Sequence, residues 1–277
     1  MNRFVKLFHF ELHRIRYWYG ALLVLTLLLQ VAGVMEYAIS YKSRFQEAVL
    51  REGISAGQYV ADYGAANFIH YSSGFFFSGP IAICAAVLLI YTLFIWYRDW
   101  VGKNMFVYRL LMIPTSRMNV FAAKLSTIML LTLGLVGFEL LVVPLQLTVF
   151  NTIMPAELRE TFNIVEVFSS HTLLQILVPN RLGQLLLYYA AGLAFVIVVF
   201  TGIMLERSYR WKGAIAGVAY VVASIVLFLM PLIASETFYR YYLYDHEVFW
   251  LLVGAGILIA GCSLALSSYL LKNKVTV

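Results

Sequence analysis

The stretch FFFSGPIAICAAVLLIYTLFIW, from Phe75 to Trp96, contains no charged residue and decides the fold class of this chain. Hydrocarbon offers no hydrogen-bond partner to a peptide group, so an apolar run of about 20 residues is expected to cross a membrane as an α-helix. The sequence predicts an all-α membrane protein with six such helices. The five other apolar runs are Trp18–Tyr37, Val120–Phe150, Leu185–Leu205, Ala214–Ile233 and Phe249–Leu271.

The composition agrees with this fold class. The 277 residues are 62% hydrophobic and 12% charged, and their mean hydropathy is +0.83. A soluble domain is about 45–50% apolar and about 25% charged. Six spans leave no room for a second globular unit, so residues 1–277 are expected to form one six-span domain. Cys84 and Cys262 lie inside apolar runs and are expected to be free thiols. The first apolar run is interpreted as a retained helix, because no signal-peptide cleavage pattern follows it.

Basic residues indicate which ends of the helices face the cytoplasm. With six spans, both termini lie on one side, and that side holds 14 of the 20 Lys and Arg residues. Its only acidic residues are Glu11, Asp99 and Glu206. Both termini are therefore predicted to be cytoplasmic. The net charge of +6 is interpreted as a topology signal and not as a nucleic-acid-binding surface.

Residues 1–17 mix basic and apolar side chains. Phe4, Leu7 and Phe8 offer an apolar side, while basic residues such as Arg14 offer charge to anionic lipid headgroups. This pattern favours an amphipathic helix on the cytoplasmic surface. A simple positive flank that fixes the topology is the alternative.

Two external loops, residues 40–74 and 151–184, are long enough to hold structure. Helical character is expected in Arg44–Asp62, where Glu47 and Arg51 are spaced to pair across one turn. In the second loop a helix along the outer interface is expected over the segment that begins with Pro155. Its apolar residues recur at helical spacing: Leu158, Phe162, Val165 and Phe168. The last external loop, Ser235–Glu247, is rich in tyrosine and is interpreted as an aromatic belt, with a substrate role for its rings as the alternative.

The sequence lacks the motifs expected for nucleotide hydrolysis and for metal binding. Gly102 and Lys103 are followed by Asn104 and lack the earlier glycine of a phosphate loop, so the chain is not expected to hydrolyse ATP itself. The five histidines show no metal-ligand spacing, and neither a metal nor a cofactor is expected on this chain. Glu139 lies inside the third span, where structural pairing or water contact is favoured over a transport role. Gly213–Gly217 is a weak helix-packing motif.

The cytoplasmic link between spans two and three, residues 97–118, is the most informative segment. From Trp96 to Leu130 the sequence reads WYRDWVGKNMFVYRLLMIPTSRMNVFAAKLSTIML. A short surface helix is predicted to stop at Ile113, because Pro114 disfavours a helical conformation in the residue before it. Thr115, Ser116 or Asn119 can then cap the helix that follows.

This segment resembles the membrane subunits of ABC-2-type transporters, in which a Leu-Leu pair, a proline turn and a lysine-containing helix join the second and third of six helices. The six-span layout, the cytoplasmic termini, the amphipathic start and the missing nucleotide-binding domain also match that family. One departure is that Asp99 and Gly102 only approximate the acidic residue and glycine often found early in the family's loop. The matching residues are Leu110, Leu111, Pro114, Thr115, Ser116, Arg117 and Lys124.

The resemblance implies that a separate ABC ATPase docks under this loop and tilts the attached spans when it closes on ATP and magnesium. It also implies a second copy or a paralogue of the chain, a membrane-lipid environment and a prokaryotic plasma membrane. Peptides, lipid-linked molecules and ions are all substrate classes within the family. The predicted ATPase-coupling residues are Arg98, Lys103, Arg109, Leu110, Leu111, Pro114, Thr115, Ser116 and Arg117.

The resulting hypothesis is a permease subunit of an ATP-driven exporter, with ATP hydrolysis on the partner. Two alternatives remain open. The first is a membrane scaffold or sensor subunit that transports nothing, and the second is an intramembrane enzyme, for which paired catalytic residues are missing. A basic loop that merely sets the topology is the alternative for residues 97–118.

Overall fold

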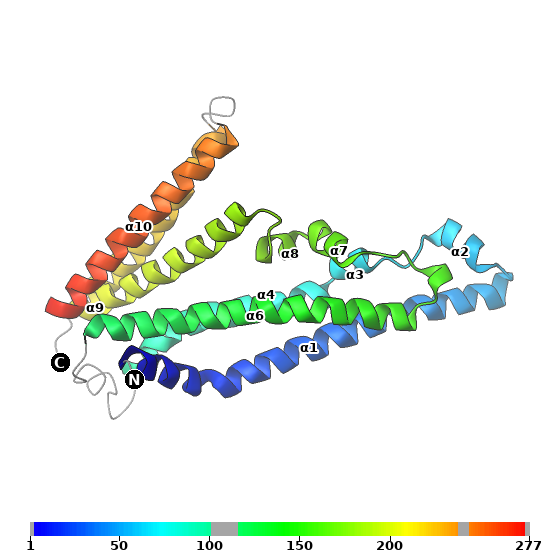
Figure 1. Ribbon diagram of the computed structural model, residues 1–277, viewed down its shortest axis with the longest axis horizontal. Helices are drawn as coiled ribbons and strands as arrows, with labels where there is room; N and C mark the ends of the chain where they lie inside the picture. Colours follow the sequence, from blue (N-terminus) through cyan, green and yellow to red (C-terminus); the bar gives the residue numbers. More distant parts are fainter. Residues whose placement is uncertain (1–2, 101–115, 238–243, 275–277) are drawn as a thin grey trace. The chain divides into compact units, whose positions relative to one another are not determined.

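A computed structural model describes residues 3–100, 116–237 and 244–274 (Figure 1). The described residues are almost entirely helical and contain no strand beyond one isolated bridge between Ala66 and Arg159. The helices are α1 (Arg3–Glu52), α2 (Ala56–Tyr63), α3 (Phe68–Ser72), α4 (Phe75–Trp100), α6 (Arg117–Ile153), the 3₁₀-helix η1 (Ala156–Leu158), α7 (Ile164–Ser170), α8 (Thr172–Leu177), α9 (Leu182–Thr237) and α10 (Asp245–Asn273).

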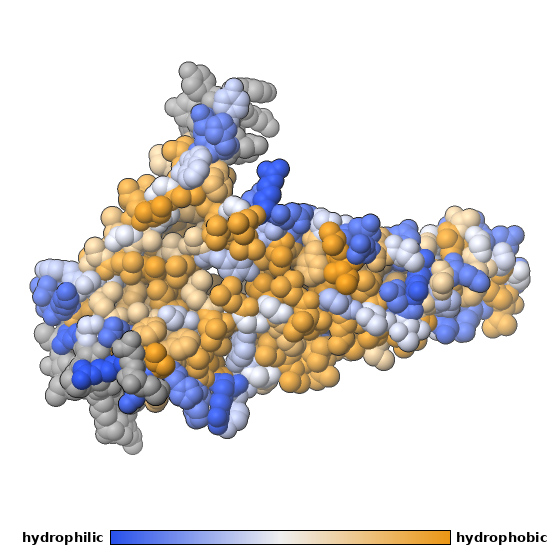
Figure 2. Space-filling model, in the orientation of Figure 1, coloured by the Kyte–Doolittle hydropathy of each residue, from blue (hydrophilic) through white to orange (hydrophobic). Residues whose placement is uncertain are grey.

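The prediction of an all-α chain with six helices able to cross a membrane is confirmed. Six helices in the described part of the chain have the required length and composition. The buried share of their apolar windows ranges from 50% in Leu182–Tyr209 down to 6% in Trp211–Ser235. Figure 2 shows apolar side chains over much of the visible surface of these helices. Such surfaces are stable against hydrocarbon or against another chain, and not against water.

The helices extend beyond the predicted spans. Helix α1 has 50 residues, which is about 75 Å at 1.5 Å per residue and far exceeds a hydrocarbon thickness of about 30 Å. It therefore enters the segment predicted as an external loop. The helical character expected in that segment is confirmed, and Arg51 lies 2.5 Å from Glu47 across one turn of α1. The predicted free thiols are also confirmed for Cys84 and Cys262.

The chain divides into two compact units. Unit 1 comprises Met1–Arg14, Leu88–Leu130 and Leu186–Val277, and unit 2 comprises Ile15–Val87 and Leu131–Leu185. Each of the helices α1, α4, α6 and α9 therefore contributes residues to both units.

In unit 1, α9 folds back on itself, so that its two arms, Leu182–Tyr209 and Trp211–Ser235, are separate candidate spans (Figure 1). A straight helix would place Gly202 and Gly217 about 22 Å apart. Instead, a Cβ atom built on Gly217 would lie 2.5 Å from the carbonyl oxygen of Gly202. The two backbones touch because neither residue carries a side chain. The packing role suggested for Gly213–Gly217 is therefore confirmed at Gly217.

Polar contacts join these two arms to α10. The Thr201 and Ser267 hydroxyls are 2.8 Å apart, and the Tyr220 and Ser263 hydroxyls are 2.7 Å apart. Thr201, Ser263 and Ser267 are wholly buried. Small hydroxyl side chains allow close helix approach and hydrogen-bond across it, which is the usual packing of helices in lipid.

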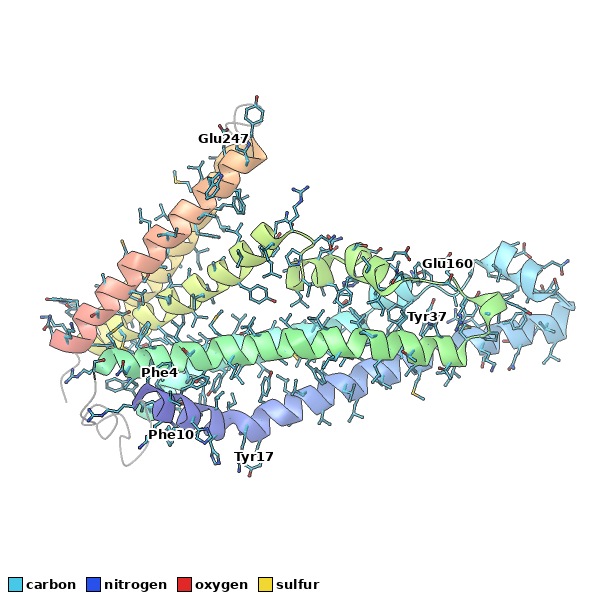
Figure 3. All side chains as sticks on the ribbon, viewed as in Figure 1. Phe4, Phe10, Tyr17, Tyr37, Glu160 and Glu247 are labelled. Carbon is cyan, nitrogen blue, oxygen red and sulfur yellow. The ribbon has the colours of Figure 1, made fainter. Side chains whose placement is uncertain are left out.

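Residues 3–14 also belong to unit 1, and their apolar side contacts protein. Leu7 is buried against Val120 and Ala123 of α6, and Phe4 and Phe8 pack at the edge of this contact (Figure 3 labels Phe4). The placement of this helix on the cytoplasmic membrane surface stays a prediction. The first residues of α6 supply Leu7 with an apolar partner that the local pattern could not reveal.

Unit 2 has its core at the end of the long helices where the short helices α2, α3, α7 and α8 gather. Phe68 and Tyr71 of α3, Phe77 of α4 and Phe150 of α6 are buried there with Val34 of α1. The segments before α3 and after η1 are tied by backbone hydrogen bonds, and Asn67 donates to Glu160 at 2.7 Å (Figure 3 labels Tyr37 and Glu160 in this region).

The prediction of one helix from Pro155 onward is wrong, because the segment is divided into several short helices. The segment forms three short helices, η1, α7 and α8, and Arg159 adopts an extended conformation between the first two. Leu158, Val167 and Leu174 are buried in the core of unit 2. The apolar residues of this segment therefore fill a protein core, and the chain must turn between short helices to bring each of them inward.

Candidate functional site

Lys124 is the centre of a buried charged site in unit 1. It lies about two turns from the start of α6, and its side chain is 0% exposed. Its Nζ atom donates to Glu11 Oε1 at 2.7 Å, to Asp99 Oδ2 at 2.5 Å and to the carbonyl oxygen of Ile95 at 2.9 Å. An ammonium group has three donors, and all three are used here. A buried charge is tolerated only with such partners.

Two arginines complete the site. Arg14 Nη1 donates to Asp99 Oδ1 at 2.7 Å, and Arg98 Nη2 donates to Glu11 Oε2 at 2.7 Å. The arginine side chains are 23% and 19% exposed, whereas the two carboxylates are almost fully buried. Each carboxylate therefore receives Lys124 on one oxygen and an arginine on the other. These five residues are called the ion cluster below, and their formal charges sum to +1.

Three helices supply the ion cluster, each for a local reason. Glu11 and Arg14 are three residues apart on α1 and so share one face. Arg98 and Asp99 lie in the last turn of α4. Lys124 comes from the first part of α6. The sequence predicted that Arg14 offers its charge to lipid headgroups, and the structure adds an ion pair with Asp99 that the sequence did not predict.

Further contacts gather at the same ends of the unit 1 helices. The Tyr97 hydroxyl donates to the Glu206 carboxylate, and the Arg207 guanidinium lies over the Tyr97 ring, 4.8 Å from its centroid. At the start of α6, Arg117 Nη1 donates to the carbonyl oxygen of Leu271 at 2.5 Å. The end of α4 is thereby joined to the reversal of α9, and the start of α6 to the end of α10.

A second buried polar site lies in unit 2. Gln30 of α1 donates from Nε2 to Glu139 Oε1 at 2.9 Å, and Gln146 donates from Nε2 to Gln30 Oε1 at 2.9 Å. The Tyr71 hydroxyl donates to the backbone oxygen of Gln30 at 2.8 Å. Gln30 and Gln146 are wholly buried, and Glu139 is 6% exposed. These three side chains, Gln30, Glu139 and Gln146, are called the amide network below.

Unit 1 also contains an apolar cavity of about 330 Å³. Its walls come from the two arms of α9 and from α10, and they include Phe195, Phe228 and Ile259. Ser224 is the one polar side chain among the lining residues. The cavity has space for an apolar group but offers little to orient a polar one. No three His, Cys, Asp or Glu side chains within the described ranges are grouped so that they could hold a metal ion.

The predicted coupling residues fall into two groups. Arg98 belongs to the ion cluster, Ser116 directly precedes α6, and Arg117 is the first residue of α6. The prediction of a surface coupling helix concerns residues outside the described ranges and stays a prediction. Those predicted residues are Lys103, Arg109, Leu110, Leu111, Pro114 and Thr115.

Sequence reasoning missed the partners in both polar sites. Glu11 and Glu206 were noticed only as acids on a basic side, and Asp99 also as an approximate match to the acidic residue of the family's loop, yet all three bind cationic or hydroxyl partners. Their rarity among basic residues was the available signal. Gln30 and Gln146 were overlooked, although an amide inside an apolar span needs a hydrogen-bond partner as much as a carboxylate does.

The fold and these sites define a multi-pass α-helical protein with two buried polar centres. No protein-family model, curated protein or solved structure matches the chain.

Proposed function

We propose that this chain is the membrane-spanning permease subunit of an ATP-driven transporter of the ABC-2 exporter type, with ATP hydrolysed on a separate ATPase subunit. One observation carries this proposal: the ion cluster joins the two helices that flank residues 101–115. Arg98 and Asp99 lie just before that segment, and Lys124 lies just after it. The segment is the one whose sequence resembles the coupling loop of that family.

The energetics of the ion cluster support a mechanical role. Breaking a buried ion pair by removing one partner costs about 3–5 kcal/mol, several times the thermal energy of about 0.6 kcal/mol. A push on residues 101–115 would therefore move the ends of α1, α4 and α6 together instead of deforming the loop alone. A membrane subunit that lacks a nucleotide site needs such a junction to receive work from a partner.

The predicted roles of the loop residues follow from their chemistry. Arg109 would form charge-assisted hydrogen bonds to carboxylates of the ATPase. Leu110 and Leu111 would fill an apolar cleft. Arg117, which donates to the carbonyl oxygen of Leu271, would hold the base of α6 beside α10. The exposed apolar arm Trp211–Ser235 would contact lipid or a second copy of the permease.

The experiment is affinity purification of the full chain from its native membranes. We expect an ATP-hydrolysing subunit with a phosphate loop to copurify. Arg109→Glu, or Leu110→Asp with Leu111→Asp, should weaken this association at least tenfold, which corresponds to about 1.4 kcal/mol. Arg181→Glu is the matched control, since Arg181 is exposed and lies on the predicted external side.

Each outcome decides something. If no ATPase copurifies with the wild-type chain, the permease proposal fails and the scaffold or sensor alternative is favoured. If the ATPase binds the wild type and the Arg109→Glu variant equally, and transport is unchanged, the loop is not the coupling element.

The predicted sidedness has its own test. In a chain with Cys262 changed to Ala, single cysteines placed at Glu47 and at Lys272 should differ in their reaction with a membrane-impermeant thiol reagent on intact cells. Both positions are exposed in the structure. We expect labelling at position 47 and none at position 272, and labelling at 272 would reverse the assigned topology.

A further inference from the structure

The amide network contains an acceptor without a donor. Gln146 Oε1 is buried and has no hydrogen-bond partner among the described residues. Leaving a buried acceptor unpaired costs about 1–3 kcal/mol. The rest of the network explains why this happens when Glu139 is ionised.

An ionised carboxylate can only accept hydrogen bonds, so it fixes the donor-to-acceptor direction of every hydrogen bond in the amide network. Gln30 must turn its NH₂ group toward Glu139, which leaves its own oxygen facing Gln146. Gln146 must then present its NH₂ group to that oxygen. Its own Oε1 is turned away and stays unpaired.

A protonated Glu139 reverses every step. The acid donates to Gln30 Oε1, and the Gln30 NH₂ group donates to Gln146 Oε1. The Gln146 NH₂ group then takes the position in which Oε1 had no partner among the described residues, so the unpaired end of the network changes from an acceptor to a donor. The reversal needs only a half-turn of each side-chain amide, whose two ends have nearly the same shape. The same three side chains therefore form a continuous hydrogen-bond chain in two directions, and one proton on Glu139 selects between them.

No charged side chain among the described residues acts on the Glu139 carboxyl group. Two titratable side chains are influenced by Glu139, namely Tyr71 of α3 and Cys84 of α4, and both are neutral at physiological pH. Cys84 Sγ is 3.1 Å from the Thr26 hydroxyl of α1. Among the described residues, Gln30 supplies the one hydrogen bond to the carboxylate. An ionisable group held in an apolar span without a counter-charge marks a functional site by default.

We propose that Glu139 is a reversible proton-binding site and that the side-chain amides of Gln30 and Gln146 reverse their hydrogen bonds when the Glu139 carboxyl group gains or loses its proton. The proton comes from water: an O–H bond forms on Glu139, a hydronium ion gives up one proton, and the formal charge of the site changes from −1 to 0. The site is independent of the ATPase assignment, since it uses residues of unit 2 only.

Protonation would alter contacts between three helices. In the ionised arrangement the Gln30 NH₂ group also lies 3.4 Å from the carbonyl oxygen of Phe77 on α4. Reversal moves that NH₂ group toward Gln146 on α6 and ends the contact with α4. Proton binding at Glu139 would thereby change the attachment of α1 to α4 within unit 2.

The test is infrared difference spectroscopy on the full chain in lipid nanodiscs, recorded between alkaline and acidic buffer. We expect a carboxylic-acid C=O band that appears on acidification, is absent in Glu139→Gln and is retained in Glu36→Gln. Glu36 is the matched control, because it lies on the same helix as Gln30 and is exposed. Glu139→Gln preserves size and an acceptor, so the variant should fold, and circular dichroism verifies this.

A second variant tests the amide reversal itself. In Gln30→Leu the protonated acid loses its acceptor, so the frequency of its C=O band should shift, and the accompanying glutamine side-chain bands should disappear. Unchanged spectra in Glu139→Gln, or a band present at every pH, would overturn the proton site. A band unaffected by Gln30→Leu would overturn the relay through the amides.

Discussion

The ion cluster of unit 1 and the amide network of unit 2 are both buried and polar, but they solve the same problem in opposite ways. The cluster buries an ammonium and two carboxylates and brings two arginines to their edge, so that every carboxylate oxygen has a cation at 2.5–2.7 Å. The network buries one carboxylate and gives it a single neutral donor at 2.9 Å. Only the second arrangement can change its charge without leaving an ion unpaired.

This difference assigns different tasks to the two units. Paired ions gain little net stability over apolar residues of the same size, but they fix which groups must stay together. The ion cluster is therefore suited to hold α1, α4 and α6 in one arrangement. The amide network is held by weaker neutral hydrogen bonds and is suited to change. The contrast predicts unequal responses to mutation.

The largest effect is expected from Glu11→Gln combined with Asp99→Asn. Lys124 would keep its buried charge and lose both anions, so that only neutral acceptors such as the carbonyl oxygen of Ile95 would remain. Removing the partner of a buried ion costs about 3–5 kcal/mol. We expect a large fall in the thermal unfolding temperature of the purified protein. Glu36→Gln with Glu52→Gln removes the same charge at exposed positions and should leave that temperature unchanged.

Replacing Lys124 as well tests whether its unpaired charge causes the loss of stability in the double variant. Adding Lys124→Met to the Glu11→Gln, Asp99→Asn pair should recover most of the lost stability, because a flexible apolar side chain replaces an unpaired ammonium. Thermal unfolding of the triple variant measures the recovery. If the triple variant is less stable than the double variant, then the cost lies in packing and not in charge, and the contrast with the amide network fails.

Contacts within one helix could be predicted from the sequence, and contacts between helices could not. The six spans were predictable because a bilayer demands long apolar helices, which a local pattern reveals. The ion pair between Glu47 and Arg51 was predictable because the two residues lie one turn apart on the same helix. Lys124 and Glu11 are 113 residues apart, and helical periodicity gives the face of a residue but not the helix that faces it.

The same reason explains why the sequence did not reveal the protein contact of residues 1–17. Phe4, Leu7 and Phe8 form an apolar side that suits lipid and protein equally well, and only the position of Val120 decides between them. In the segment after Pro155, helical spacing was present but the turns between short helices were not visible. For the amide network, Glu139 was predicted as a polar site, whereas Gln30 was not, since an amide carries no charge to attract notice.

A smaller effect is expected from Glu139→Gln. The variant keeps an oxygen that accepts from Gln30 and removes a buried charge that has no counter-ion among the described residues. A neutral hydrogen bond contributes about 1 kcal/mol, so stability should change by less than about 1 kcal/mol in either direction. Thermal unfolding under the conditions used for the ion-cluster variants provides the measurement. A loss as large as that of the Glu11→Gln, Asp99→Asn pair would show that unit 2 depends on its charge as unit 1 does.

The smallest effect concerns a third kind of buried polar group, His171, between α7 and α8 in unit 2. Its side chain is buried, and the edge of its ring faces Phe77, with 5.1 Å between the ring centroids. Burial lowers the pKa of this imidazole below its usual range, and a hydrogen bond to the backbone of Ser72 partly opposes that shift. The folded state therefore favours the neutral ring, whereas the unfolded chain takes up a proton near pH 6.5.

The sign of the pH dependence follows from this difference. Above about pH 6.5 both states are neutral and His171 leaves stability constant, while below it the unfolded state binds more protons and the free energy of unfolding falls. The protection factors of the α7 and α8 amides, which compare their exchange with that of the unfolded chain at the same pH, should fall on acidification. His171→Gln should abolish this fall in protection, and the exposed His70→Gln should retain it. If His171→Gln stays as acid-sensitive as the wild type, the response belongs to a different group.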